Sequence, residues 1–169
     1  GAQLWTIDTV TGEVLEWRPL FDGAVDCIAN LDEILITGGR FAHASGVSRQ
    51  GLAAWNTLTG ELLPWDPTPA GGVVRALAID CDLVYIGGSF TQIGGASRNK
   101  LAAIDIHSGL ATPWNPGEAG SITMVTSMDV WKTGLVVGGD FSHIGGKLRH
   151  NLAHIDSATG QATEWNPGA

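Results

Sequence analysis

Hydrophobic and polar positions alternate in short runs along the whole chain, and no stretch has the spacing of a capped amphipathic helix. Residues 73–79 and 83–86 are apolar, β-branched runs separated by the polar turn Asp-Cys-Asp at 80–82. Residues 101–106 and 110–114 flank a second polar turn in the same way. Apolar runs separated by short turns predict antiparallel hairpins, so we expect an all-β protein.

This pattern repeats. Four segments align without gaps, each starting at Leu, with Gly eight residues later and Trp thirteen residues later: 4–17, 52–65, 101–114 and 152–165. Between them recur a Gly doublet, a Phe and an Arg at matching positions: Gly38–Gly39, Phe41 and Arg49; Gly87–Gly88, Phe90 and Arg98; Gly138–Gly139, Phe141 and Arg149. The repeat lengths are 48, 49 and 51 residues, which predicts a repeat architecture.

Each repeat is predicted to form four short strands, with the doublet ending the second strand and the Trp on the fourth. Four antiparallel strands in about 50 residues are the unit of a β-propeller. We therefore expect residues 1–169 to form one propeller segment of about three and a half four-stranded antiparallel blades. Its parts are an orphan outer hairpin at 4–17 and blades at about 24–66, 73–115 and 122–166. The turn between the first two strands is expected to absorb the length variation.

The string YIGGSFTQIGGASRNKLAAIDIHSG at residues 85–109 resembles known propeller repeats. The Gly-Gly strand end, the Asp in the last turn and the Trp resemble a kelch-type blade, and the full string is more similar to bacterial delta-60 repeats and to blades of fungal cortical-marker proteins. This resemblance covers essentially the whole chain and implies a propeller, a fold that hosts many binding platforms. The string LWTIDTVTGEVLEW resembles the blade motif of quinoprotein dehydrogenases, which lacks the Gly-Gly-x-Phe and Ile-Gly-Gly elements found here.

Residues that recur in every repeat are predicted to serve the fold. The Trp of each repeat could belong to a carbohydrate-stacking platform, but its constant position favours packing between neighbouring blades. An Asx residue precedes each turn Gly by four positions (Asp8, Asn56, Asp105 and Asp156), so its side chain is expected to accept hydrogen bonds from the turn backbone. The recurring Arg is expected to pin the connection between the second and third strands.

The glycines and cysteines give two expectations that concern stability. The first Gly of each doublet is expected to lie where the backbone conformation or a close approach excludes a side chain, so Val there should cost more than ~1 kcal/mol. Cys27 aligns with Ala76 on a first strand, whereas Cys81 aligns with Asp32 in a turn. The two thiols are therefore predicted not to pair with each other.

Less regular positions are the candidates for ligand binding. His43, Gln92 and His143 each lie two residues after the repeated Phe, on the connection between the second and third strands. They would present polar groups along one face, or they are ordinary solvated loop residues. Metal ligation is not expected, because blade-related positions are typically more than about 10 Å apart. Trp131, in the turn that the alignment makes longest, is either an exposed contact residue or a cover for a blade edge.

Composition narrows the function classes. With Lys+Arg 9 against Asp+Glu 17, the net charge of -8 argues against binding to nucleic acid or to anionic membranes. No apolar run approaches the roughly 20 residues of a membrane span. The motifs of serine hydrolases, zinc proteases and phosphate cradles do not occur, so no catalytic residue, metal or cofactor is predicted. We interpret the chain as a non-catalytic binding or scaffold module with a protein or carbohydrate ligand, extracellular or on a bacterial cell surface.

Two other function classes stay open: a sugar-active propeller enzyme or quinoprotein-type dehydrogenase fragment, and a structural unit of a surface layer or filament. Closed propellers typically have four to eight blades, so this chain is expected to leave open edges. Further blades, from a longer chain or from neighbouring subunits in an oligomer, would cover these edges. A symmetric ring of copies cannot complete every blade, because each chain already uses its three inner strand pairs.

Overall fold

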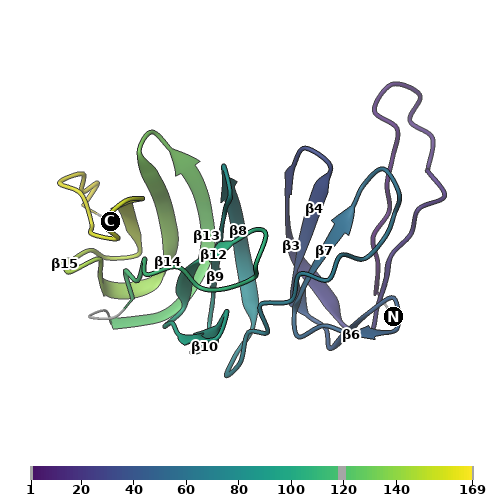
Figure 1. Cartoon of the computed structure of the whole chain (residues 1–169). Helices are drawn as coiled ribbons and strands as arrows, with labels where there is room; N and C mark the ends of the chain where they lie inside the picture. The colour runs from purple at the N-terminus through teal and green to yellow at the C-terminus, as the bar shows by residue number, and fades with distance from the viewer. Residues whose placement is uncertain (1, 118–120, 169) are drawn as a thin grey trace.

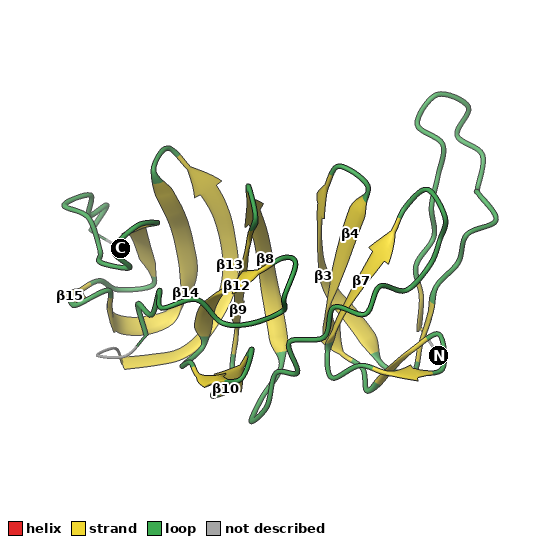
Figure 2. Cartoon of the chain, viewed as in Figure 1, coloured by secondary structure: helices red, strands yellow, loops and turns green. Residues whose placement is uncertain are grey.

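The computed structural model describes residues 2–117 and 121–168, and these form strands and connections without a helix. The all-β class predicted from the sequence is confirmed (Figure 2). The strands are β1 Ala2–Gln3, β2 Leu20–Phe21, β3 Ala24–Leu31, β4 Ile34–Arg40, β5 His43–Ala44, β6 Val47–Ser48, β7 Leu52–Asn56, β8 Val74–Asp80, β9 Leu83–Gly88, β10 Gln92–Ile93, β11 Ala96–Ser97, β12 Leu101–Asp105, β13 Ser121–Trp131, β14 Gly134–Ile144, β15 Lys147–Leu148 and β16 Leu152–Asp156.

Three antiparallel sheets of the same design follow one another along the chain and stack face to face (Figure 1). The first sheet is β3–β4–β7, the second is β8–β9–β12, and the third is β13–β14–β16. Residues 4–17, called the N-terminal hairpin below, extend beside the first sheet and are joined by a single bridge between Ile7 and Val14. The repeat found in the sequence is therefore a repeat of sheets.

The fourth strand of each repeat is shorter than predicted. Only one bridge ties it to the third strand, and these bridges join Trp55 to Leu62, Ile104 to Ala111 and Ile155 to Ala162. In two repeats the next-but-one residue is Pro64 or Pro113, which has no N–H for a ladder. In the third repeat Glu164 stands there, and the chain leaves the sheet at the same point. Each sheet is thus three-stranded, with a fourth segment held by one bridge.

Apolar layers between consecutive sheets form the core. Successive residues of a strand point to opposite faces, so each middle strand feeds two layers. In the second sheet Val84 and Ile86 pack toward the first sheet, and Tyr85 packs toward the third. We call the face toward the next sheet in chain order the forward face. The forward face of the second sheet comprises Ala76, Ala78, Tyr85, Leu101 and Ala103.

The first glycine of each doublet allows the sheets to approach closely. A Cβ at Gly38 would come within 2.7 Å of the Val74 side chain in the second sheet. A Cβ at Gly87 would come within 2.5 Å of Val125 in the third sheet. Of the two reasons predicted for glycine here, close approach is therefore the one that applies. Gly138 differs, because its Cβ would meet only the Ser127 Oγ of its own sheet, at 2.5 Å, and the Asn151 carbonyl oxygen at 3.8 Å.

The length variation of the repeats lies outside the hairpins, and the expectation that a turn absorbs it is wrong. In each sheet the first two strands are joined by a two-residue turn. The pairs that fix the register are Val25 with Gly39, Val74 with Gly88 and Val125 with Gly139, each separated by 14 residues. Cross-strand register holds this hairpin length constant. The connection that follows each repeated Trp varies instead, because no sheet ladder constrains it.

Candidate ligand-binding edge and the open end of the stack

The second and third strands of each repeat are connected by a small hairpin rather than by the open loop predicted from the sequence. These hairpins are β5–β6, β10–β11 and the end of β14 with β15. Each follows a middle strand, so all three lie along the edge of the sheets that is opposite the two-residue turns. Figure 1 shows β6 and β10 along this lower edge. We call it the hairpin edge.

The hairpin edge carries three of the four predicted binding residues. His43 begins β5, Gln92 begins β10, and His143 is the last residue but one of β14. All three side chains are exposed. In each repeat the Phe two residues earlier is buried, which anchors the start of the hairpin in the core. The prediction that equivalent polar side chains project from one side of the scaffold is consistent with this placement.

The recurring Arg ties each hairpin to the fourth segment of its own repeat. One guanidinium nitrogen donates to the carbonyl of the preceding residue, and the other reaches the carbonyl of the residue 14 positions later. The second set of bonds joins Arg49 to Leu63 at 3.0 Å, Arg98 to Thr112 at 2.6 Å and Arg149 to Thr163 at 2.6 Å. The predicted pinning role of the Arg is confirmed, and it makes each hairpin a fixed support.

His43 is oriented by a carboxylate that the sequence analysis did not single out. Its Nδ1 lies 2.7 Å from Asp22 Oδ2, while Asp22 Oδ1 accepts the backbone N–H groups of Ala42 and His43. These N–H groups and the imidazole lower the pKa of Asp22 to about 2, so its carboxylate stays charged at neutral pH. Asp22 and His43 line a shallow hollow of about 430 Å³ with Leu20, Phe21 and Gly46.

The other two repeats give the same backbone position different chemistry. Gly71 lies three residues before Val74, as Asp22 lies three before Val25, so Gln92 has no matching carboxylate there. The backbone of Gln92 bridges Ala70. His143 Nδ1 lies 3.4 Å from the Ser142 hydroxyl. Because the partner of His43 comes from a segment before the sheet, the spacing of the repeat could not reveal it.

Trp131, the fourth predicted binding residue, lies at the opposite edge of the sheets, next to the two-residue turn between β13 and β14. It is the last residue of β13 and pairs with Gly134, so it occupies the place of Leu31 in the first sheet rather than the longest turn. His143 lies nine residues further along β14, a distance of about 30 Å for an extended strand. The four predicted residues therefore do not form one site.

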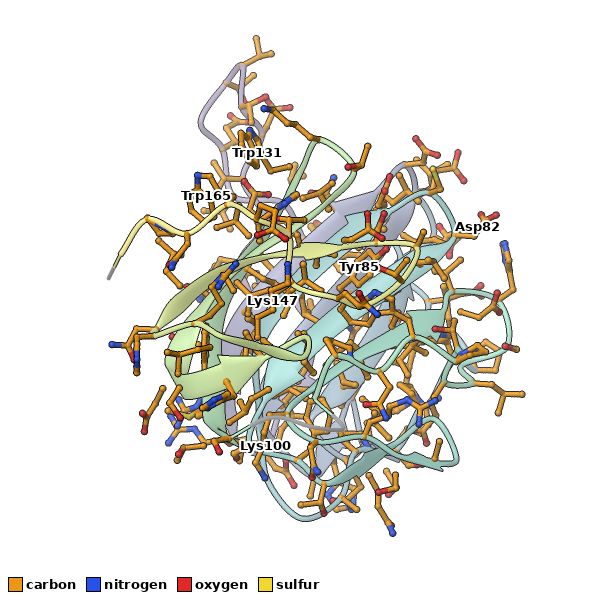
Figure 3. All side chains as sticks on the ribbon, turned by 90° about the vertical axis from the view of Figure 1, so that its left-hand side faces the viewer. Asp82, Tyr85, Lys100, Trp131, Lys147 and Trp165 are labelled. Atoms are coloured by element: carbon orange, nitrogen blue, oxygen red, sulfur yellow. The ribbon has the colours of Figure 1, made fainter. Side chains whose placement is uncertain are left out.

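Trp131 covers the forward face of the third sheet and is still 40% exposed. Its ring meets the His154 ring edge-on at 5.2 Å, and its carbonyl lies 3.0 Å from His154 Nε2. Lys132 Nζ lies 4.1 Å from the ring centroid, and the Trp165 ring lies 6.1 Å away (Figure 3). The indole thus packs on the sheet edge, which is one of the two predicted roles, and its role as a contact residue stays a prediction.

The recurring Trp joins neighbouring repeats, as predicted. Trp17, Trp65 and Trp114 each donate Nε1–H to a backbone carbonyl in the last turn of the following repeat. These acceptors are Gly60 at 3.0 Å, Asp105 at 3.2 Å and Asp156 at 3.0 Å. Trp165 is 38% exposed, and its indole N–H has no acceptor in the part of the chain that the structure describes.

The Asx residues and the cysteines also behave as predicted. Each Asx side chain accepts backbone N–H groups two and three residues later in its turn. These hydrogen bonds contribute to lowering the pKa values of Asp8, Asp105 and Asp156. Cys27 and Cys81 are both free thiols. Over the described residues, no three His, Cys, Asp or Glu side chains gather closely enough to hold a metal ion.

The chain is therefore an all-β protein built from repeated antiparallel sheets. No protein-family model and no curated protein matches it. Among solved structures it is similar to the crystal structure of the computationally designed Ika8 protein, with a TM-score of 0.59 and 20% identity. The match covers 95% of this chain and 42% of that chain, and at this identity it shows the fold alone. Within residues 2–117 and 121–168 no helix is long and apolar enough to cross a membrane.

Proposed function

We propose that this chain is an arc of a β-propeller that acts as a non-catalytic, extracellular binding or scaffold module, and that its ligand binds the hairpin edge. The stacking of three like sheets in chain order, with each Trp inserted under the next repeat, supports the propeller arc. The delta-60 and kelch-type resemblance of the repeat stays a prediction and is the basis for the extracellular location.

One observation carries the binding proposal. His43, Gln92 and His143 project from the same place on three hairpins, and each hairpin is anchored by a buried Phe and an Arg. Side chains on fixed supports lose little conformational entropy when a ligand binds. A scaffold that repeats one exposed position with varied polar residues is suited to recognition.

The chemistry of these groups favours a polar, uncharged ligand surface. Imidazole and carboxamide side chains form directional hydrogen bonds with polar partner groups. Hydroxyl groups of a carbohydrate or peptide groups of an extended protein segment would complement them. The fixed Asp22–His43 pair leaves Nε2 as the imidazole nitrogen that faces a ligand, because Nδ1 is bonded to Asp22.

The experiment screens a glycan array and a displayed peptide library, and then maps the best probe by backbone amide chemical shifts. Replacing His43, Gln92 and His143 together by Ala should weaken binding of that probe at least tenfold. The matched control replaces Glu33, Asp82 and Lys132 by Ala. These three residues are also exposed, but they lie in the two-residue turns on the edge opposite the hairpin edge. Shifts confined to those turns, or turnover of a chromogenic glycoside, would overturn the proposal.

A further inference from the structure

The forward face of the third sheet differs from the forward faces inside the stack. On its first strand, β13, Ser127 and Asp129 replace Ala76 and Ala78 of the second sheet and Cys27 and Ala29 of the first. Both Ser127 and Asp129 are exposed. On its outer part the face keeps Leu152 and Trp165, the counterparts of Leu101 and Trp114. Two forward positions of β13 are thus polar, whereas Trp131 at the end of that strand, Leu152 and Trp165 form an apolar area that extends to the outer part of the face.

The opposite end of the stack is apolar. Trp5, Ile7 and Val14 of the N-terminal hairpin are 52%, 58% and 47% exposed. Their counterparts in the second repeat are Ala102, Ile104 and Ala111, which pack against the forward face of the first sheet. The hairpin therefore presents, at least half exposed or nearly so, the side chains that the second repeat packs against the first sheet. Within the chain, the Arg18 guanidinium covers part of Trp5, 4.5 Å from its ring centroid.

Each end of the chain also carries one unused half of the contact that recurs between repeats. In the C-terminal repeat, the Trp165 indole N–H has no acceptor within the described residues. At the N-terminal end, no atom of the described chain lies within 4 Å of a Cβ built at Gly12, whereas Gly60 and Gly160 face the indoles of Trp17 and Trp114. The chain thus holds both partners of a fourth Trp–turn contact, at opposite ends.

We propose that two copies of this chain bind head to tail, with the N-terminal hairpin of one copy seated on the apolar area of the forward face of the other's third sheet. Trp165 then donates its N–H to the turn at residues 8–12 of the partner copy. Trp5 and Ile7 of that copy pack on Leu152 and Trp131. This inference rests on the proposed function, which takes the chain to be an arc of a β-propeller.

The polarity of Ser127 and Asp129 fits this occupant. Residues 4–17 correspond to the third and fourth segments of a repeat. In the other junctions the positions equivalent to Ser127 and Asp129 face the first two strands of the next repeat, so docking of residues 4–17 leaves both side chains hydrated. A complete sheet would have to desolvate the Asp129 carboxylate, which is costly without a partner. No copy needs a spare pair of inner strands, so the obstacle to a symmetric ring does not arise.

One charge contact would add to this docking. The turn and fourth segment of the N-terminal hairpin contain Asp8, Glu13 and Glu16, while Arg18 lies over the Trp5 ring, 4.5 Å from its centroid. In the first junction, the turn that holds Asp32 lines one hollow with His107, a residue of the next repeat's last turn. Lys132 occupies the place of Asp32 in the third sheet, so docking brings its ammonium group to the acidic hairpin. Such a contact gives rings or open filaments, depending on the rotation between copies.

The test measures mass by light scattering and sedimentation equilibrium over a range of protein concentrations. The unaltered chain should form oligomers as its concentration rises. Ile7→Asp and Trp165→Ala should each give monomers at every concentration. An equimolar mixture of these two variants should give a dimer and nothing larger, because each variant keeps one working end. Leu58→Asp is the matched control, since Leu58 is the exposed counterpart of Val10 in the first repeat and should not affect assembly.

A monomer at all concentrations overturns the proposal, and so does a mixture of the two variants that stays monomeric. Assembly that Leu58→Asp also abolishes would be non-specific and would count against it. Both altered residues are exposed, and equal melting temperatures of the two variants and dilute unaltered chain verify the fold. Val14→Asp repeats the test at a second hairpin position. Ligand binding at the hairpin edge, measured on the monomeric variants, separates failure of this contact from failure of the proposed function.

Discussion

The second and third sheets present the same forward face in two different environments. Their strands pair in equivalent register, yet Ala76 and Ala78 lie against a further sheet while Ser127 and Asp129 face solvent. Repeats with the same backbone geometry can therefore carry different side chains on the forward face, according to whether another sheet or solvent covers it. Ser127 and Asp129 on β13 keep that part of the face hydrated, as polar residues do on the exposed faces of stacked repeats.

The outer parts of the two forward faces differ in exposure but not in polarity. Leu101 and Trp114 are buried in the junction, and their counterparts Leu152 and Trp165 remain apolar although they are partly exposed. A face intended only for solvent would have lost these side chains as well. The difference between the two polar positions of β13 and the apolar area is what limits our proposed contact to that area.

The largest contrast between a closed and an open face should appear in thiol reactivity. Burial, together with the Asp26 carboxylate, raises the pKa of Cys27 to about 12. At pH 8 its thiolate is then on the order of a thousand times scarcer than that of an exposed thiol with a pKa of about 8.5. Two variants in a Cys81→Ser background compare the positions: one keeps Cys27, and the other combines Cys27→Ala with Ser127→Cys. Cys27 should react with a disulfide reagent on the order of a thousand times more slowly than the cysteine at position 127. Equal rates would show that the first junction opens readily.

The next contrast concerns the two tryptophans that end the second and third repeats. Trp114→Ala removes a buried indole and its hydrogen bond to Asp156, and should lower the free energy of unfolding by about 3–5 kcal/mol. Trp165→Ala removes a partly exposed indole and should cost less than about 1 kcal/mol. Urea unfolding at low protein concentration measures both on the monomer. If the costs match, Trp165 is packed within the monomer as tightly as Trp114, which would contradict its exposure.

The smallest contrast concerns the glycine doublets. Gly87→Val forces a side chain against Val125 and Met128 of the third sheet and should cost about 1–3 kcal/mol. Gly138→Val meets the exposed Ser127 hydroxyl, which has room to rotate, so its cost should be lower by at least about 1 kcal/mol. The same urea titration compares the two variants. A larger loss for Gly138→Val would mean that the third sheet also needs a close approach on its forward face.

Several local roles could be predicted from the sequence because they depend on neighbours at fixed spacing. The Asx turns close within four residues, and each Arg reaches a carbonyl 14 residues later in its own repeat. A one-dimensional period captures such contacts in full. The three main strands of each sheet could be predicted for the same reason. The small hairpins of the hairpin edge and the early end of the fourth segment were not predicted.

By itself, the sequence determined that the protein is all-β, that it repeats, and that His43, Gln92 and His143 are equivalent. Only the tertiary structure decided that Trp131 takes the place of Leu31, that it lies far from His143, and that Asp22 orients His43. Cross-strand register fixes the place of Trp131, and the sequence alignment had left that register open. The Asp22 carboxylate comes from the segment before the first sheet, where the other repeats have no carboxylate, so the repeated pattern does not include it.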